Sequence, residues 1–282
     1  IITNVVNILL DWIFIVELGL AARGAAIATV IAEYVGLVVA LLALRGRVRS
    51  EALTLPWAAL REFQPYIHLL RSNTHLFVRT LALLWAFAFF TAAGESLGTE
   101  VVAANAVMMQ FLLLAAFALD GFAYAAEGMT GEALGARDRT RFRAVVRRCA
   151  FWSGLAAVVI SLLILIARPW LFPLLSDIEA VQMVMRAQGL WLVMLPLAAA
   201  PSYLLDGVFI GVGATREMMF SMVFSALAVY LPVWYLTQDL QNNGLWLAFT
   251  LFNLSRGITL AGAYAWFSYR HRWFSPPLDQ PV

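Results

Sequence analysis

The feature that most constrains this chain is a succession of apolar blocks, each long enough to cross a lipid bilayer. Hydrophobic residues make up 62% of the 282 positions and charged residues only 13%, whereas about 25% is usual in soluble domains. An α-helix of about 20 apolar residues spans the hydrocarbon core of a membrane. The apolar blocks therefore predict an all-α polytopic membrane protein.

Polar breaks divide the apolar blocks into eight expected transmembrane helices. These cover residues 2–16, 24–44, 67–93, 100–132, 146–167, 183–212, 217–237 and 245–269. Prolines within the sixth and seventh are tolerable, because neighbouring helices satisfy the backbone carbonyls that a proline frees. The stretch 168–181 is too broken to span and is expected to lie at the membrane interface.

Arginines are distributed unequally between alternate loops. One set of loops holds most of them, including the cluster in "GARDRTRFRAVVRR" (135–148), whereas the other set holds only Arg23, Arg168 and Arg186. Loops rich in arginine stay on the cytoplasmic side, so we expect both ends of the chain to be cytoplasmic. We interpret the cluster as an ordinary cytoplasmic loop in preference to a site for lipid headgroups or a regulator.

Enzyme and metal motifs are missing from the sequence. Cys149 is the single cysteine and can form no internal disulfide, and no Walker A, H-E-x-x-H or G-x-S-x-G motif occurs. A net charge of +2 gives no argument for nucleic-acid binding. We therefore expect no enzyme activity, no metal site, no cofactor and no nucleic-acid partner.

A sparse internal repeat relates the first and last helix pairs, because Gly24 aligns with Gly244 and Ala28 with Ala248 at one constant shift. Repeat-built bundles of this kind are typical of secondary transporters. The chain opens without methionine and is expected to be the inner part of a longer protein that has lost N-terminal helices. The expected parts are the last hairpin of an N-terminal lobe (1–46), a cytoplasmic linker (47–66), a C-terminal six-helix lobe (67–272) and a cytoplasmic tail (273–282).

Four segments resemble multidrug and toxic compound extrusion transporters, in particular their DNA-damage-inducible F branch. "AANAVMMQFLLLAAFALDGFAYAAEGMTGEALGARDR" (103–139) resembles the eighth helix of that family, and "LLDGVFIGVGATREM" (204–218) resembles the tenth. "FVRTLALLWAFAFFTAAGESLG" (77–98) is similar to the seventh, and the opening hairpin to the fifth and sixth. The resemblance covers essentially the whole chain.

This resemblance implies a monomeric antiporter of twelve helices in two lobes, located in the bacterial inner membrane and surrounded by its lipids. Such proteins carry out multidrug efflux, exporting organic and often cationic small molecules against an inward proton or sodium gradient. Members carry an acidic coupling residue in their first helix, which precedes this chain. A truncated chain is therefore expected not to transport by itself.

Asp206 is the leading candidate for ion coupling. It lies ten residues before Arg216 and is flanked by apolar segments, so its short side chain cannot easily reach the interface. Ionisable residues inside a membrane cost at least about 2.5–3.5 kcal/mol each and are functional candidates by default. The position also matches an acidic residue of the family's tenth helix that is implicated in cation coupling. The alternative is a structural carboxylate paired with an arginine.

Asp120 is the second candidate, because Tyr124 and Glu127 follow it at helical spacing and share its stripe. Asn105 and Gln110 fall within about a quarter turn of that stripe. Such a polar face suits a helix that lines an aqueous cavity for substrate, to which Tyr203 could add an aromatic wall. Hydrogen bonding between helices explains Asn105 and Gln110 equally well, and Glu127 lies near enough to the loop to be interfacial.

Arg79 is the expected partner of Asp120 or Asp206, unless its long side chain extends to the interface. Arg256 and Glu33 also fall deep in expected helices, without an assigned role. Several glycines are expected to allow close helix approach or to end a helix. They are Gly128, Gly131, Gly135, Gly211 and Gly213.

Two other functions remain open from the sequence. A lipid-linked saccharide flippase of the same superfamily would need deep arginines for pyrophosphate, whereas the deep charges of this chain are mainly acidic. A membrane-embedded transferase would need catalytic groups clustered at one membrane face beside a substantial loop. The longest loop, about residues 45–66, offers little of that kind.

Overall fold

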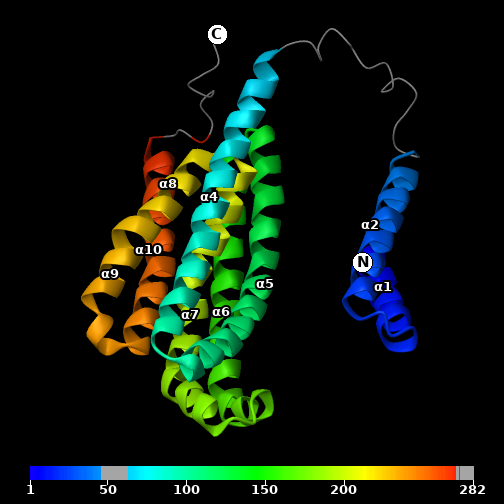
Figure 1. Ribbon diagram of the computed structural model, residues 1–282. Coiled ribbons are helices and arrows are strands. Elements are labelled where there is room, and N and C mark those ends of the chain that lie inside the picture. The colour runs from blue at the N-terminus through cyan, green and yellow to red at the C-terminus, as the bar shows by residue number, and fades with distance from the viewer. Residues whose placement is uncertain (46–62, 271–272, 274–282) are drawn as a thin grey trace. The chain divides into compact units, whose positions relative to one another are not determined.

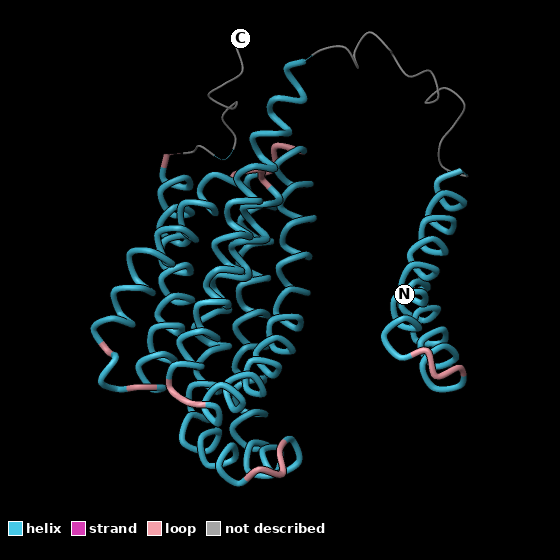
Figure 2. Tube along the Cα trace, in the orientation of Figure 1, coloured by secondary structure: helices cyan, strands magenta, loops and turns pink. Residues whose placement is uncertain are grey.

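The computed structural model describes residues 1–45, 63–270 and 273. Within these ranges the chain is helical, and short loops and turns join the helices (Figure 2). The chain divides into two compact units, Ile1–Pro65 and Tyr66–Val282. All eight expected helices are present in the described part, so the expected all-α class is confirmed.

The first unit is a helical hairpin. Helix α1 (Ile2–Asp11) continues into a π-helical turn, η1 (Trp12–Glu17), and α2 (Ala21–Arg45) returns alongside. Close contact depends on Gly24 of α2, where an added Cβ would lie 3.0 Å from the backbone of Phe14. Most other side chains of the hairpin are apolar and exposed, as expected for a surface that needs lipid or further helices to cover it.

The second unit is a bundle whose long helices run side by side (Figure 1). It contains α4 (Phe63–Ser96), α5 (Thr99–Gly135), α6 (Arg139–Leu175) and α7 (Glu179–Gly211). The next span is divided into α8 (Thr215–Phe224), a π-helical turn η3 (Ser225–Tyr230) and α9 (Leu231–Leu236). A short 3-10 turn, η4 (Gln238–Leu240), leads into α10 (Asn242–Tyr269).

Helix α7 is the central element of this bundle. It packs against α5, α6 and α10. In its most apolar 18-residue segment, 61% is buried, compared with 33% or less in the corresponding segment of every other candidate span. Six helical segments in the described ranges are long and apolar enough to cross a membrane: Ala21–Arg45, Leu69–Ser96, Thr99–Gly135, Arg139–Leu175, Glu179–Gly211 and Thr215–Leu236. A polar side chain on the inner faces of α7 is therefore enclosed by protein.

The sequence indicated that helical structure is interrupted over 168–181, and this is wrong for residues 168–175. Helix α6 continues through Pro169 and Pro173 to Leu175, and only residues 176–178 separate it from α7. Proline bends a membrane helix without ending it where neighbouring groups satisfy the freed carbonyls. The interfacial position of this stretch stays a prediction.

The expected linker and tail lie mostly outside the described residues. Helix α4 begins at Phe63, inside the expected linker of 47–66. Trp273, the first residue of the expected tail, packs against Phe142 and Phe209 with ring centroids 5.4 and 5.5 Å away. This aromatic contact places Trp273 against the start of α6 and the end of α7.

Candidate functional site

Asp206 is the centre of a buried charge cluster. The residue is 6% exposed and lies on α7. One oxygen, Oδ2, accepts hydrogen bonds from Nη2 of Arg79 on α4 and from Nη2 of Arg256 on α10, the latter at 2.8 Å. A single carboxylate therefore joins three helices that are far apart in the sequence.

Arg256 is the more completely enclosed of the two arginines, at 2% exposure. Its Nη1 donates to Oδ1 of Asn253 at 3.2 Å, and Asn253 is held in turn by the carbonyl oxygen of Phe249. The guanidinium carbon lies 5.9 Å from the ring centroid of Tyr203 and 5.6 Å from that of Phe252. Cation–π attraction at these distances supports a buried arginine.

Asp120 on α5 completes the cluster at longer range. Its half-exposed carboxyl group interacts electrostatically with Asp206, Arg79 and Arg256. Two aspartates and two arginines make the group neutral when all four are ionised. The deep charges are thus balanced, and not mainly acidic as the sequence indicated, because Arg79 and Arg256 both turn inward.

Close packing of α5 on α7 places the two aspartate-bearing helices together. A Cβ added at Gly207 would overlap the carbonyl oxygen of Ala123, and one added at Gly211 would overlap that of Glu127. A Cβ at Gly131 would lie 2.9 Å from the carbonyl oxygen of Gly211. Small residues at four-residue spacing allow helix backbones to approach in this way, directly beside Asp206.

Only some of the expected glycine contacts are present. Gly131 and Gly211 lie at the α5–α7 contact as expected, and Gly213, with φ of +73°, follows the end of α7. The expectation for Gly128 and Gly135 is wrong, because a Cβ at either would meet no atom within 4 Å. Gly135 follows Gly131 by one helical turn on the same face, but Gly131 already lies against Gly211, the last residue of α7.

The expected polar stripe on α5 divides into unlike groups. Asn105 is 3% exposed and forms a reciprocal pair with Asn242, at 2.9 and 3.0 Å, while its Oδ1 also accepts from Nε1 of Trp246 at 2.9 Å. It lies about 22 Å along the helix from Asp120. Of the two readings left open for Asn105, the structure therefore favours hydrogen bonding between helices.

The remaining stripe residues lie on or near the surface of the second unit. Gln110 is exposed, Tyr124 is 70% exposed and Glu127 is half-buried. Tyr203 on α7 differs, because it faces the cluster and interacts electrostatically with all four charged groups. A role of these residues in a substrate cavity stays a prediction.

Arg256 and Asn253 belong to the site, although neither has a role predicted from the sequence. Their three-residue spacing puts both on one face of α10, and a charge in the middle of an apolar helix requires a partner. That signal was visible, but the partner, 50 residues earlier on α7, follows only from the packing. Glu33 is exposed on α2, within the first unit.

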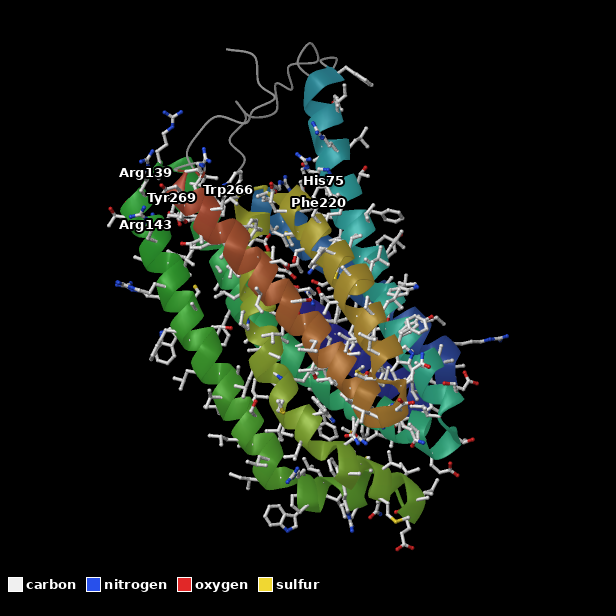
Figure 3. The ribbon with its side chains drawn as sticks, turned by 90° about the vertical axis from the view of Figure 1, so that its left-hand side faces the viewer. His75, Arg139, Arg143, Phe220, Trp266 and Tyr269 are labelled. Atoms are coloured by element: carbon white, nitrogen blue, oxygen red, sulfur yellow. The ribbon has the colours of Figure 1, made fainter. Side chains whose placement is uncertain are left out.

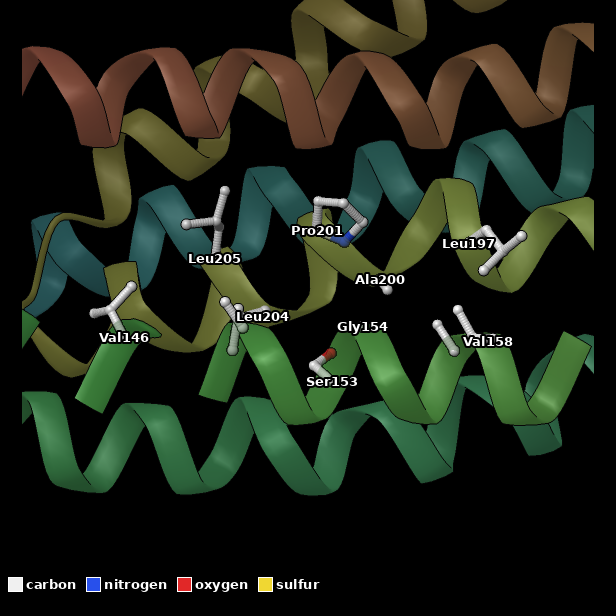
Figure 4. Close-up of a pocket in the computed structure, with 11 residues that line it drawn as sticks. Val146, Ser153, Gly154, Val158, Leu197, Ala200, Pro201, Leu204 and Leu205 are labelled. Atoms are coloured by element: carbon white, nitrogen blue, oxygen red, sulfur yellow. The ribbon is translucent and has the colours of Figure 1, made fainter. Parts of the chain in front are cut away.

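An apolar cavity of about 430 Å³ lies between α6 and α7, apart from the charge cluster (Figure 4). Ser153 supplies the polar side chain of its lining, and its buried hydroxyl has no hydrogen-bond partner among the described residues. Pro201 and Leu204 face it from α7. No group of three or more metal-ligating side chains occurs in the described ranges.

Comparison with known proteins places the chain in one family. The sequence model of the MatE family matches residues 76–236, more than half of the chain. The chain belongs to the MatE family. It is therefore a multi-pass membrane protein with the fold of these transporters, and the resemblance read from its motifs is confirmed.

MatE relatives from bacteria and plants align along nearly the whole chain. DNA damage-inducible protein F of Escherichia coli is 36% identical over 277 residues, which cover 96% of this chain and 59% of that protein. Protein DETOXIFICATION 43 of Arabidopsis thaliana is 27% identical over 265 residues, 92% of this chain and 48% of that protein. The chain thus spans about half to three-fifths of the length of these relatives.

Solved MatE structures share the fold. The MATE transporter VcmN of Vibrio cholerae in its bent form superposes with a TM-score of 0.82 and 25% identity, covering 97% of this chain and 62% of that one. A MATE structure in the straight conformation gives a TM-score of 0.81 at 18% identity, covering 97% and 61%.

Proposed function

We propose that this chain is the C-terminal part of a secondary active antiporter of the bacterial inner membrane. The complete protein would export organic, often cationic, small molecules by alternating access between two lobes, driven by a proton or sodium gradient. The observation that carries this proposal is the buried carboxylate of Asp206, which α4 and α10 share through Arg79 and Arg256. Family membership supports it.

The charge balance of the cluster supplies the coupling. With all four groups ionised, the two carboxylates offset the two guanidinium groups. A proton or sodium ion on Asp206 would weaken both ion pairs and leave excess positive charge between α4, α7 and α10. The loaded state therefore favours a different arrangement of these helices, and an ion shifts such an equilibrium only through this differential affinity.

Binding of the coupling ion and of the substrate to neighbouring carboxylates of one cluster would allow one to displace the other. Asp120 is half-exposed, so its carboxylate is the group of the cluster best placed to attract a cationic substrate. Tyr203 adds an aromatic face beside Arg256, and Tyr124, Glu127 and Gln110 would line the wider cavity. A coupling ion on Asp206 and a cationic substrate at Asp120 would oppose each other's binding, because each adds positive charge to a cluster that already holds two arginines, and such mutual opposition favours antiport.

The test uses the complete protein, including the sequence upstream of this chain, reconstituted in lipid vesicles. Efflux of a fluorescent cationic dye is measured after imposing a pH gradient or a sodium gradient separately. We expect Asp206→Asn to abolish gradient-driven efflux and Asp120→Asn to reduce it. Glu132→Gln, which removes an exposed carboxylate paired with Arg141, is the matched control and should leave efflux unchanged.

Normal coupled efflux by the double variant of Asp206→Asn and Asp120→Asn would overturn the assignment of these residues. Failure of the unaltered protein to move dye under either gradient would overturn the antiporter proposal itself. If the variants bind dye normally but do not respond to the gradient, the cluster serves ion coupling. If they lose dye binding alone, it serves substrate recognition and the coupling role is wrong.

A further inference from the structure

Three arginines form a row on the first turns of α6. Arg139, Arg143 and Arg147 follow one another at four-residue spacing and, with Thr140 and Ala144, line a groove of about 320 Å³. All three side chains are exposed. Figure 3 shows Arg139 and Arg143 at one end of the bundle. We call these three residues the arginine row.

Within the arginine row, Arg143 and Arg147 repel each other across one turn of α6. Like charges four residues apart on a helix repel by about 0.2–0.5 kcal/mol per pair. Cations near a helix N-terminus also oppose the helix dipole. Among the described residues, Arg141 forms an ion pair with Glu132 at 2.7 Å, whereas Arg143 and Arg147 have no carboxylate partner. An anion bound in the groove would relieve this repulsion.

The groove is held on a fixed scaffold. Asp138 caps α6 by accepting a hydrogen bond from the backbone N–H of Arg141 at 2.9 Å. Phe142, 1% exposed, packs against Trp273 and Tyr264 with ring centroids 5.4 and 6.5 Å away. Because these contacts fix the first turns of α6, the arginine row is positioned before any ligand arrives.

Exposed apolar side chains follow the arginine row along α6. Phe151, Leu155 and Leu162 lie 4, 8 and 15 positions after Arg147, within about a quarter turn of it, and all three are exposed. The 37 residues of α6 extend about 55 Å, more than the roughly 40–45 Å of a complete bilayer. An apolar track thus continues from the Arg147 end of the row and winds partly around α6, with the spacing of a lipid headgroup and its chains.

Interfacial aromatic residues mark the same end of the bundle. Trp266 and Tyr269, near the end of α10, lie at the end that carries Arg139 and Arg143 (Figure 3), and Tyr269 is exposed. Tryptophan and tyrosine are enriched at the level of lipid headgroups. The groove therefore opens at the depth where phosphate groups are concentrated.

We propose that the arginine row binds the phosphate of an anionic phospholipid, whose acyl chains lie along Phe151, Leu155 and Leu162. Guanidinium groups bind phosphate through paired hydrogen bonds. The apolar track distinguishes a phospholipid from free phosphate, which would use the arginines alone. This site is separate from the Asp206 cluster and does not depend on the proposed transport activity.

Native mass spectrometry of the detergent-purified chain, titrated with phosphatidylglycerol or phosphatidylcholine, tests the site. Changing all three residues of the row to glutamine should weaken phosphatidylglycerol binding by at least about tenfold. Changing Arg137, Arg141 and Arg148 to glutamine removes the same charge from the same region. This matched control should change binding by less than about threefold, because those residues do not line the groove.

Two further arms separate a lipid site from bulk electrostatics. Lysine at all three positions of the row keeps the charge but not the paired hydrogen bonds, and should give a loss smaller than the glutamine variant. Inorganic phosphate should compete only weakly. Equal losses in the two glutamine variants, equal binding of phosphatidylcholine, or full displacement by inorganic phosphate would each overturn the proposal.

Discussion

Asp206 and Arg256 are 50 residues apart in the chain, yet the carboxylate of one and the guanidinium of the other are 2.8 Å apart in the bundle. Both side chains are removed from solvent, so each would be costly without the other. Arg79 adds a second cation to the same oxygen. The retention of a charged residue in each of three apolar helices is explained by this shared contact.

Neutralising Asp206 should destabilise the second unit. In the chain purified in detergent, we expect Asp206→Asn to lower the free energy of unfolding by about 3–5 kcal/mol, because buried Arg256 and half-buried Arg79 lose their counter-ion. Adding Arg256→Gln should recover part of that loss. Denaturant titration of the single and double variants gives the coupling energy, and strictly additive effects would show that the pair is not coupled.

The two Asp-Gly pairs of the chain should respond differently to alanine. Gly207→Ala places a Cβ against the carbonyl oxygen of Ala123, and we expect a loss of about 1–3 kcal/mol in unfolding free energy from overpacking. Gly121→Ala meets no atom within 4 Å and should be neutral or stabilise by up to about 1 kcal/mol through helix propensity. Similar losses from both would contradict the close α5–α7 contact.

Asn105 should matter to stability more than its neighbour Gln110 on the same helix. Asn105→Ala leaves Asn242 and the indole N–H of Trp246 without their partner, and should cost about 1–3 kcal/mol. Gln110→Ala changes an exposed side chain and should stay within about 0.5 kcal/mol of the unaltered chain. Equal thermal shifts for the two variants would be inconsistent with the buried amide pair.

Two buried serines should respond with opposite sign. Ser153→Ala removes a hydroxyl without a hydrogen-bond partner, and the unfolding free energy should stay unchanged or rise by about 1 kcal/mol. Ser202→Ala removes a hydroxyl that donates to the carbonyl of Ala199 at 2.8 Å and should cost about 0.5–1.5 kcal/mol. A loss at Ser153 as large as at Ser202 would indicate that the cavity supplies a partner, such as water.

Much of the fold was predictable, because a membrane helix satisfies its own backbone hydrogen bonds. Each span is therefore visible as a local apolar block, as for α5, expected at 100–132 and found at Thr99–Gly135. The length of α6 is greater than the expected 146–167, because the helix continues at both ends through arginines and prolines to Arg139 and Leu175. Gly131 and Gly211 are contact residues as expected, but the small-residue spacing of Gly131 with Gly135 also indicated Gly135, which makes no such contact.

The sequence by itself determined which residues are costly to bury, and Asp206, Asp120 and Arg79 were identified on that ground. The sequence also indicated Arg79 as the partner of one of the two aspartates, but only the tertiary structure decided which one and added Arg256. In the folded bundle Asp206 pairs with both Arg79 and Arg256. Asp120 interacts with them at longer range, and Asn105 forms an amide pair with Asn242. The reason is physical: the cost of a buried charge is local to its helix, whereas its compensation depends on which helix faces meet.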